Sequence, residues 1–248
     1  MTTFLLVHGP KDSGKTTVAL SIAGCFWHKK ILFIDTDPTN PLFSQFTQEQ
    51  PPLSLGNLAL KIAEKAYTSV EQLDWAFSEL AVPVSETQDV FALGVHNDWD
   101  FQPFIIEKLQ TGFHRFCKDY DYCVIDGSHP LMALLCHPQD VICLEILTEA
   151  ALESWQGTVF SDPKIPDNTE SQQGLFFSAA IIQYAILVNK VHSDTKSSLA
   201  YSKVLNSAIL HSQTKLIGKI PFFNSSLTFN NEFEIALEPC LQRLNLQF

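Results

Sequence analysis

The segment GPKDSGKTT, residues 9 to 17, combines glycine, lysine and hydroxyl residues at a spacing that suits phosphate binding. The pattern G-x-x-x-x-G-K-[ST] is fitted by Gly9, Gly14, Lys15 and Thr16. An apolar run precedes the segment and a helical pattern follows it, so glycine N–H groups and a helix N-terminus can surround one anion. Lys15 would reach the β- and γ-phosphates of a nucleotide, and the Thr16 hydroxyl would bind Mg²⁺. The alternative is an ordinary turn that holds these residues, which the strand–loop–helix context disfavours.

Carboxylates end two further apolar runs. Asp35 and Asp37 come directly after residues 31–34, and Asp126 ends residues 122–126. Open parallel sheets bind ligands at the C-terminal ends of their strands. There one carboxylate of the Asp35–Asp37 segment can hold a magnesium-bound water while the other orients an attacking water, and Asp126 takes the place of a magnesium-side carboxylate. A turn is an equally supported reading of the Asp35–Asp37 segment, because Asp-Pro and Asn-Pro dipeptides favour turns.

Two other polar residues follow apolar runs. Asn189 ends the run over residues 184–188, and its amide can both donate to and accept from a purine edge. The alternative for Asn189 is a strand-ending turn. His129 stands beside Pro130, where a loop residue is the favoured reading and a general base the less supported one.

Apolar runs alternate with amphipathic stretches along the chain. Strands are predicted at residues 4–7, 31–34, 90–95, 122–125, 141–147 and 184–188. Helices are predicted at residues 15–27, 58–80 and 104–117. The helix over residues 58–80 rests on the near-helical spacing of Leu60, Ala63, Val70, Leu73 and Phe77. The alternation predicts an α/β fold of three layers, α/β/α, with a mainly parallel twisted sheet, as in P-loop NTPases. We expect one domain over residues 1–248, with residues 161–173 as a surface loop.

Charge and composition argue against several kinds of partner. The chain has 16 Lys and Arg against 27 Asp and Glu, a net charge of −11, which disfavours direct DNA binding. The C-terminal residues 229–248 have helical spacing but acidic side chains, so an anionic membrane would repel them. We expect this tail to form a helix on the sheet that Pro239 interrupts. No apolar stretch reaches the length of a membrane helix, and six cysteines without a CxxC pair predict free thiols in a reducing cytoplasm.

The order of these segments resembles the ParA/MinD family of P-loop ATPases, also called the deviant Walker A family. The resemblance is carried by residues 9–17, 34–38 (IDTDP), 124–128 (VIDGS), 187–191 (LVNKV) and 218–221 (GKIP), of which IDTDP is the most family-specific. It implies ATP and Mg²⁺ as cofactors, slow hydrolysis, and an ATP-dependent homodimer acting on a protein partner. Plasmid or chromosome partition, cell division, conjugation, secretion and cellulose synthesis are the processes that such switches serve.

The resemblance also implies roles for individual residues. Asp37 would orient the attacking water, Asp126 would lie on the magnesium side, and Asn189 would contact adenine. The catalytic set would be Lys15, Asp37 and Lys11, and the metal side would be Thr16, Asp35 and Asp126. The nucleotide would contact Gly9, Pro10, Lys11, Asp12, Ser13, Gly14, Lys15, Thr16, Thr17, Asn189 and Pro221.

The loop departs from the family at its hallmark lysine. Family members have a lysine directly after the first glycine, which crosses to the partner's phosphates, whereas here Pro10 has that place and Lys11 follows. Lysine has a long flexible stem, so Lys11 can still reach across an interface. The alternatives are that it balances the charge of Asp12 or lies in solvent, and the pattern does not decide between the three.

Three other functions compete with the ATP-driven switch. A small-molecule enzyme similar to dethiobiotin synthetase would use a substrate pocket near the phosphates, to which Ser128, His129 and Lys11 would contribute. A metal-delivery ATPase would need paired cysteines, but Cys123 and Cys143 fall in predicted strands and read as core thiols. A module that binds nucleotide without hydrolysis is disfavoured by the presence of both Asp37 and Asp126.

Overall fold

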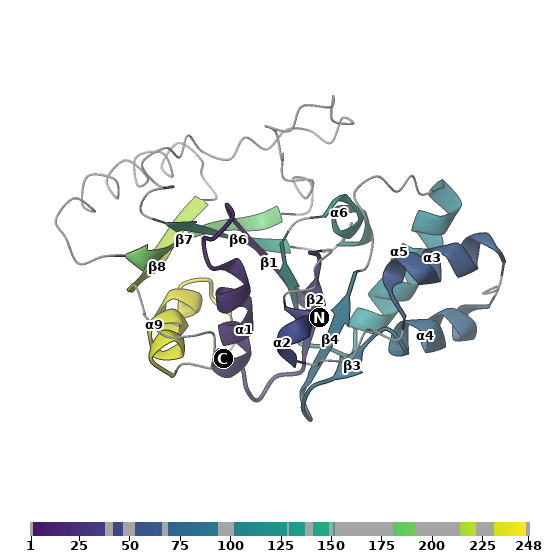
Figure 1. The fold of residues 1–248 in the computed structure, drawn as a ribbon, viewed down its shortest axis with the longest axis horizontal. Helices are drawn as coiled ribbons and strands as arrows, with labels where there is room; N and C mark the ends of the chain where they lie inside the picture. The colour runs from purple at the N-terminus through teal and green to yellow at the C-terminus, as the bar shows by residue number, and fades with distance from the viewer. Residues whose placement is uncertain are drawn as a thin grey trace.

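The computed structural model describes residues 2–37, 42–46, 53–65, 69–93, 102–127, 129–136, 141–148, 151, 181–191, 214–221 and 231–246 (Figure 1). Its centre is one eight-stranded sheet in the order β3-β4-β2-β5-β1-β6-β7-β8. The strands are β1 (Thr3–His8), β2 (Ile31–Asp35), β3 (Val82–Pro83), β4 (Gln88–Ala92), β5 (Tyr122–Asp126), β6 (Val141–Thr148), β7 (Ile181–Val191) and β8 (Thr214–Pro221). All pairs are parallel except β3 with β4.

The described helices cover both faces of this sheet. They are α1 (Lys15–Cys25), α2 (Phe43–Phe46), α3 (Leu55–Ala63), α4 (Val70–Ser78), α5 (Pro103–Cys117), α6 (Pro130–Cys136) and α9 (Asn231–Gln242). Helices α1, α2 and α9 share one hydrophobic core with the sheet, while α3, α4, α5 and α6 share the other. Figure 1 shows α1 beside α9, and α3, α4 and α5 grouped away from them. The predicted three-layer α/β fold with a mainly parallel sheet is confirmed.

The central strands are apolar at nearly every position because both of their faces are covered. In β1, Phe4 and Leu6 pack into the α5 side, whereas Leu5 and Val7 pack into the α1 side. Successive side chains of a strand point to opposite faces, so a short continuous apolar run fills two cores at once. This explains why these strands are visible in the sequence without any alternation of polar and apolar residues.

One predicted helix is wrong in its extent. Residues 58–80 do not form a single helix: α3 ends at Ala63 and α4 begins after Ser69. Ser69 starts α4 with a capping box, in which its hydroxyl accepts from Gln72 N and the Gln72 side chain accepts from Ser69 N. The apolar face predicted across the whole segment is also wrong, because Leu60, Ala63 and Val70 are exposed.

Two further boundaries differ from expectation. The strand predicted over residues 90–95 is β4, which begins at Gln88 and ends at Ala92, while residues 94 and 95 lie outside the described residues. Helix α9 continues through Pro239 to Gln242. The carbonyl that Pro239 leaves without an N–H donor belongs to Ile235, a residue on the exposed side of the helix. The predicted loop over residues 161–173 lies outside the described residues.

The parallel strands bring the predicted functional segments to one edge of the sheet. Asp35 is in register with Asp126 on β5, and Asp126 is in register with Val7 on β1. The P-loop follows β1, and Asn189 lies near the end of β7. The C-terminal edge of the sheet is therefore the candidate site.

Candidate functional site

The P-loop makes close contacts that only glycine permits. Gly14 has φ 90°, and a β-carbon there would lie 2.4 Å from Asn189 Nδ2. A β-carbon on Gly9 would lie 2.2 Å from the Ile146 carbonyl oxygen of β6. The two glycines of the motif thus let the loop pass against β6 and the end of β7, where a larger residue would push it away.

Helix α1 begins in the loop with its N-terminus open. Gly14 is its N-cap, no side chain caps the helix, and no acidic residue lies in its first turn. The first N–H groups of a helix lack partners within the helix and carry partial positive charge. Lys15 is half-buried, and its Nζ donates to the Pro10 carbonyl at 2.9 Å across the loop. The loop therefore presents donors and a cation that suit a phosphate chain.

Thr16 and Asp126 meet at the mouth of this loop. The Thr16 hydroxyl donates to Asp126 Oδ2 at 2.7 Å, and the other carboxylate oxygen, Oδ1, is buried without a hydrogen-bond partner among the described residues. Burial raises the pKa of Asp126 to about 6, although the Thr16 hydrogen bond and nearby Lys15 act in the opposite direction. A buried carboxylate oxygen without a partner, next to a hydroxyl, fits Mg²⁺, which prefers hard oxygen ligands and favours the ionised acid.

The protein side of such a metal site consists of few groups. Within the described ranges, no cluster of three or more His, Cys, Asp and Glu side chains is placed to hold a metal ion. Mg²⁺ commonly keeps several waters and takes one or two protein ligands together with substrate phosphates. Thr16 and Asp126 are therefore compatible with a magnesium ion that arrives with a nucleotide.

Asp35 lies beside Asp126 but serves the following loop in this structure. It is fully buried, and its carboxylate accepts from Asp37 N at 3.1 Å and from Phe43 N at 2.8 Å. Burial raises the pKa of Asp35 to about 7, with a smaller contribution from the neighbouring Asp126. The carboxylate thus anchors both ends of the turn between Asp37 and Phe43, and its assignment to the metal side stays a prediction.

Thr36 links that turn to the Asp126 strand. Its N–H and its hydroxyl both donate to the Asp126 carbonyl, at 3.2 Å and 2.7 Å. Asp37, the next residue, is exposed at the edge of the sheet, where an attacking water would be accessible to it. The sequence reading missed Thr36, although its place between two candidate carboxylates was a signal that could have drawn attention to it.

Asn189 contacts the P-loop in this structure. It is 3% exposed, its Nδ2 donates to the Ser13 carbonyl at 2.9 Å, and its Oδ1 accepts from Lys190 N at 2.9 Å. Lys190 was not predicted as a site residue, yet its Nζ donates to the Asp12 carbonyl at 2.6 Å. The adenine contact predicted for Asn189 stays a prediction.

The remaining predicted loop residues lie at the surface. Pro10, Lys11 and Asp12 are exposed, and Asp12 has φ 61°, in the left-handed region that forms the tip of the loop. Thr17 lies in the first turn of α1. Pro221 ends β8 and is exposed at the same edge of the sheet, on the outermost strand beyond β6 and β7.

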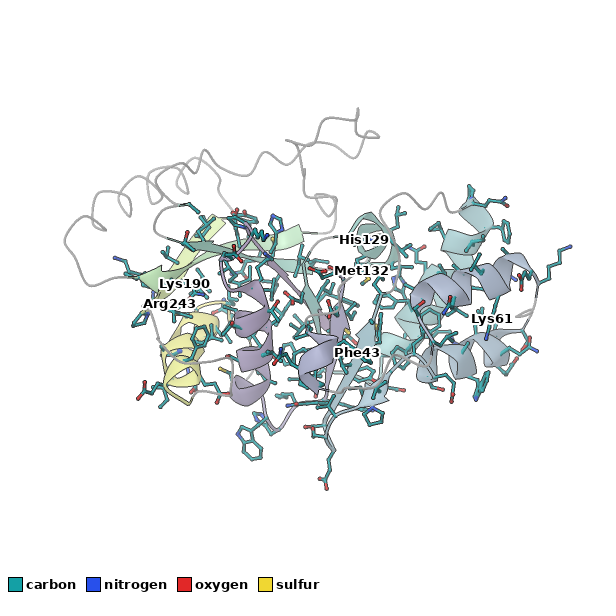
Figure 2. The ribbon with its side chains drawn as sticks, in the orientation of Figure 1. Phe43, Lys61, His129, Met132, Lys190 and Arg243 are labelled. Atoms are coloured by element: carbon teal, nitrogen blue, oxygen red, sulfur yellow. The ribbon has the colours of Figure 1, made fainter. Side chains whose placement is uncertain are left out.

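Two histidines lie near this edge, His129 buried and His8 half-buried. His129 is 4% exposed, its Nδ1 accepts from Leu131 N at 3.1 Å at the start of α6, and its Nε2 has no partner among the described residues. Figure 2 shows His129 and Met132 together at α6, well separated in the view from Lys190. His8 ends β1 directly before Gly9, and burial lowers its pKa to about 4, with Lys15 adding to the effect. The favoured reading of His129 as a loop residue is thus refined, since the imidazole caps a helix.

No protein-family model matches the chain, and no curated protein matches it. Solved structures match it over nearly its full length. A plasmid partition protein from Borrelia burgdorferi is 14% identical with a TM-score of 0.58, and the match covers 98% of each chain. The MinD cell division protein of Aquifex aeolicus is 16% identical with a TM-score of 0.59, and the match covers 100% of this chain and 98% of that one.

A third similar structure belongs to a biosynthetic enzyme. Cobyrinic acid a,c-diamide synthase from Mycobacterium smegmatis, with bound ADP and magnesium, is 17% identical with a TM-score of 0.64, and the match covers 99% of this chain and 95% of that one. At identities this low the likeness establishes the fold. Proteins with this fold thus include a plasmid partition protein and a diamide synthase, so function has to be argued from the site.

Proposed function

We propose that this chain, which has the fold of the ParA/MinD P-loop ATPases, binds ATP with Mg²⁺ and hydrolyses it slowly as a switch for a protein partner. The observation that carries the proposal is the contact between Thr16 and Asp126 at the mouth of the P-loop, with Asp126 Oδ1 buried and without a partner among the described residues. Similar structures include a putative plasmid partition protein bound to AMPPNP and a synthase bound to ADP and magnesium.

The residues at this edge of the sheet would divide the tasks of binding phosphate, binding metal and orienting water. The α1 N-terminus and Lys15 would hold the β- and γ-phosphates, and Thr16 and Asp126 would hold Mg²⁺. Asp35 stays on the metal side as the anchor of the following turn. A magnesium ion held by Thr16 and Asp126 would supply positive charge that offsets the charge on the phosphates. Asp37 accepts a proton from, or orients, the attacking water, because it is an exposed carboxylate that follows β2 at this edge.

Surface charge favours a protein as the partner. The net charge of −11 opposes binding to a nucleic-acid backbone or an anionic membrane. Among the described residues, no helix is long and apolar enough to cross a membrane. From the surface charge we propose that this chain is one P-loop domain that regulates a protein complex of the partition, conjugation, secretion or cellulose-synthesis type. Its free thiols favour the reducing cytoplasm as its compartment.

The first test is phosphate release from ATP in the presence of Mg²⁺. The wild type should hydrolyse ATP slowly, Lys15→Gln should lose nucleotide affinity, and Asp37→Ala should bind ATP but lose hydrolysis by roughly 100-fold. Asp119→Ala is the matched control, because Asp119 is an exposed aspartate before β5, at the opposite edge of the sheet. Equal hydrolysis by wild type and Asp37→Ala would remove Asp37 from the mechanism, and a wild type that binds no nucleotide would refute the proposal.

A second candidate function is an ATP-dependent small-molecule enzyme. The observation in its favour is His129, a buried imidazole whose Nε2 has no partner among the described residues and which lies three residues after Asp126. This candidate requires that ATP turnover depend on a small carboxylic acid or amine substrate. Turnover that a panel of such compounds leaves unchanged, but that a partner protein accelerates, would favour the switch.

The third candidate, metal delivery, has little support. Cys117, Cys123, Cys136, Cys143 and Cys240 are buried and Cys25 is half-buried, so these thiols are core residues. Burial raises the pKa of the Cys136 and Cys143 thiols well above their ordinary value, which opposes the thiolate form that binds metal.

A further inference from the structure

Lys190 contacts the P-loop from a strand that lies far from it in sequence. Its Nζ donates to the Asp12 carbonyl at 2.6 Å, and the Nδ2 of its neighbour Asn189 donates to the Ser13 carbonyl at 2.9 Å. Two successive side chains of β7, of which Figure 2 labels Lys190, therefore hold two successive carbonyls of the loop. We call Asn189 and Lys190 together the β7 clasp.

The backbone around the clasp is shaped for this contact. Lys190 has φ 57°, a left-handed conformation that residues other than glycine rarely adopt. Its N–H donates to Asn189 Oδ1 at 2.9 Å, which stabilises this turn of the chain. Gly14 leaves the space that the Asn189 amide fills, since a β-carbon there would lie 2.4 Å from Nδ2. The clasp and the second glycine of the motif thus fit each other.

Holding a carbonyl also directs the neighbouring N–H group. In a trans peptide the C=O and the N–H of one unit point in opposite directions. Because Asn189 draws the Ser13 carbonyl toward itself, the Gly14 N–H of the same peptide is directed away from β7 and remains for an anion. Lys190 adds a positive charge beside a loop that also contains the acidic Asp12.

We propose that the β7 clasp fixes the P-loop in its phosphate-binding conformation, with Lys190 as a positioning residue for the phosphates. The inference rests on the proposed nucleotide binding and deepens it. Both side chains of the clasp bond to carbonyls of the phosphate-binding loop, those of Ser13 and Asp12, so the clasp acts on the phosphate end of the ligand. Its contribution is then independent of the base.

Two ligands separate phosphate binding from base binding. We would measure the dissociation constants of Mg²⁺–ADP and of magnesium tripolyphosphate by calorimetry for wild type, Lys190→Met and Lys190→Arg. Lys190→Met keeps most of the stem but removes the charged donor, so affinity for both ligands should fall by the same factor, roughly tenfold. Lys190→Arg retains the cation and should stay within about threefold of wild type.

Lys65→Met is the matched control for these variants. Lys65 is an exposed lysine with φ 60°, so the control reproduces both the loss of charge and a methionine in left-handed backbone. It should bind both ligands as the wild type does, and thermal unfolding without ligand should show that every variant folds.

The outcomes are distinct. Equal loss of both ligands in Lys190→Met, with recovery in Lys190→Arg, supports the clasp. Loss of Mg²⁺–ADP affinity alone overturns it and places Lys190 at the nucleoside. Unchanged affinity for both ligands overturns the clasp while nucleotide binding by the wild type stands. A wild type that binds neither ligand overturns the clasp and the proposed function together.

Discussion

At the scale of single residues, the proposed metal dependence of the site rests on the Asp126 carboxylate. Asp126→Asn keeps the shape of the side chain and an oxygen for Thr16 but removes the charge that favours Mg²⁺. We expect Mg²⁺ affinity in the presence of ATP to fall roughly 10–100-fold. Titration of Mg²⁺ at fixed ATP measures this, with Asp119→Asn as a control at the opposite edge of the sheet. An unchanged titration would move the metal away from Asp126.

His8 makes the free energy of unfolding depend on pH. Burial lowers the pKa of His8 to about 4, with Lys15 contributing, whereas the unfolded chain has the ordinary value of 6.5. Between these values the unfolded chain binds a proton that the folded chain does not, so stability is full above about pH 6.5 and is lost as pH falls toward 4. His8→Gln should therefore reduce the loss of unfolding free energy between pH 7.5 and 5 by about 1–2 kcal/mol.

Urea unfolding at the two pH values measures this difference. The exposed His28 supplies the matched substitution, His28→Gln, which should leave the pH dependence as it is in the wild type. If His8→Gln retains the full acid sensitivity of the wild type, the folded protein protonates His8 readily and the burial argument is wrong.

At the scale of elements, the packing of α4 on α5 depends on Gly112. A β-carbon at Gly112 would lie 2.4 Å from the Phe77 ring, so the glycine lets the ring pass close to the α5 backbone. Alanine favours a helix over glycine by about 1 kcal/mol, but overpacking a core costs about 1–3 kcal/mol. We expect Gly112→Ala to be destabilising on balance, as measured by urea unfolding.

A double-mutant cycle tests the named contact. Phe77→Leu removes the ring, so Gly112→Ala should cost less in that background than in the wild type, and the two effects should not add. Strict additivity would mean that Phe77 is not what the added methyl group meets.

The elements also show what a sequence can predict. The central strands could be predicted because strands buried on both faces are continuous apolar runs. Such a run is visible in the local sequence without knowing which strand pairs with it. The break between α3 and α4 does not show in the apolar spacing, which continues across it, although Ser69 and Gln72 form a readable capping signal. Strand β3 has only two residues, and it forms by pairing with β4, which no local pattern encodes.

The candidate site likewise has parts that the sequence predicts and parts that it does not. The P-loop and Asp126 were predictable, because glycines and a strand-ending carboxylate are fixed by backbone geometry. The contact of Lys190 with Asp12 was not, since it joins residues 178 positions apart through a flexible side chain. The partners of Asp35 likewise depend on how the turn before Phe43 folds back. Side-chain direction, more than residue type, is what the sequence leaves undetermined.

At the scale of the whole molecule, the open question of Lys11 becomes a question of association. Lys11 is exposed at the tip of the P-loop, where it can meet the nucleotide of a second copy. If Asp37 orients the water, Asp37→Ala holds the ATP state, and its mass by light scattering with ATP and Mg²⁺ should be twice the 27.8 kDa of one chain. With ADP it should remain a single chain.

The salt dependence of dimer formation is a second, independent test of this association. Each chain has a net charge of −11, so two copies repel, and salt screens that repulsion over about 8–10 Å at 0.1–0.15 M. The ATP-dependent dimer should therefore strengthen as salt rises from low to physiological concentration. Lys11→Ala should weaken it only if that lysine crosses the interface in spite of Pro10. A mass that stays at one chain while ATP is bound would rule out the paired switch and direct attention to a substrate beside His129.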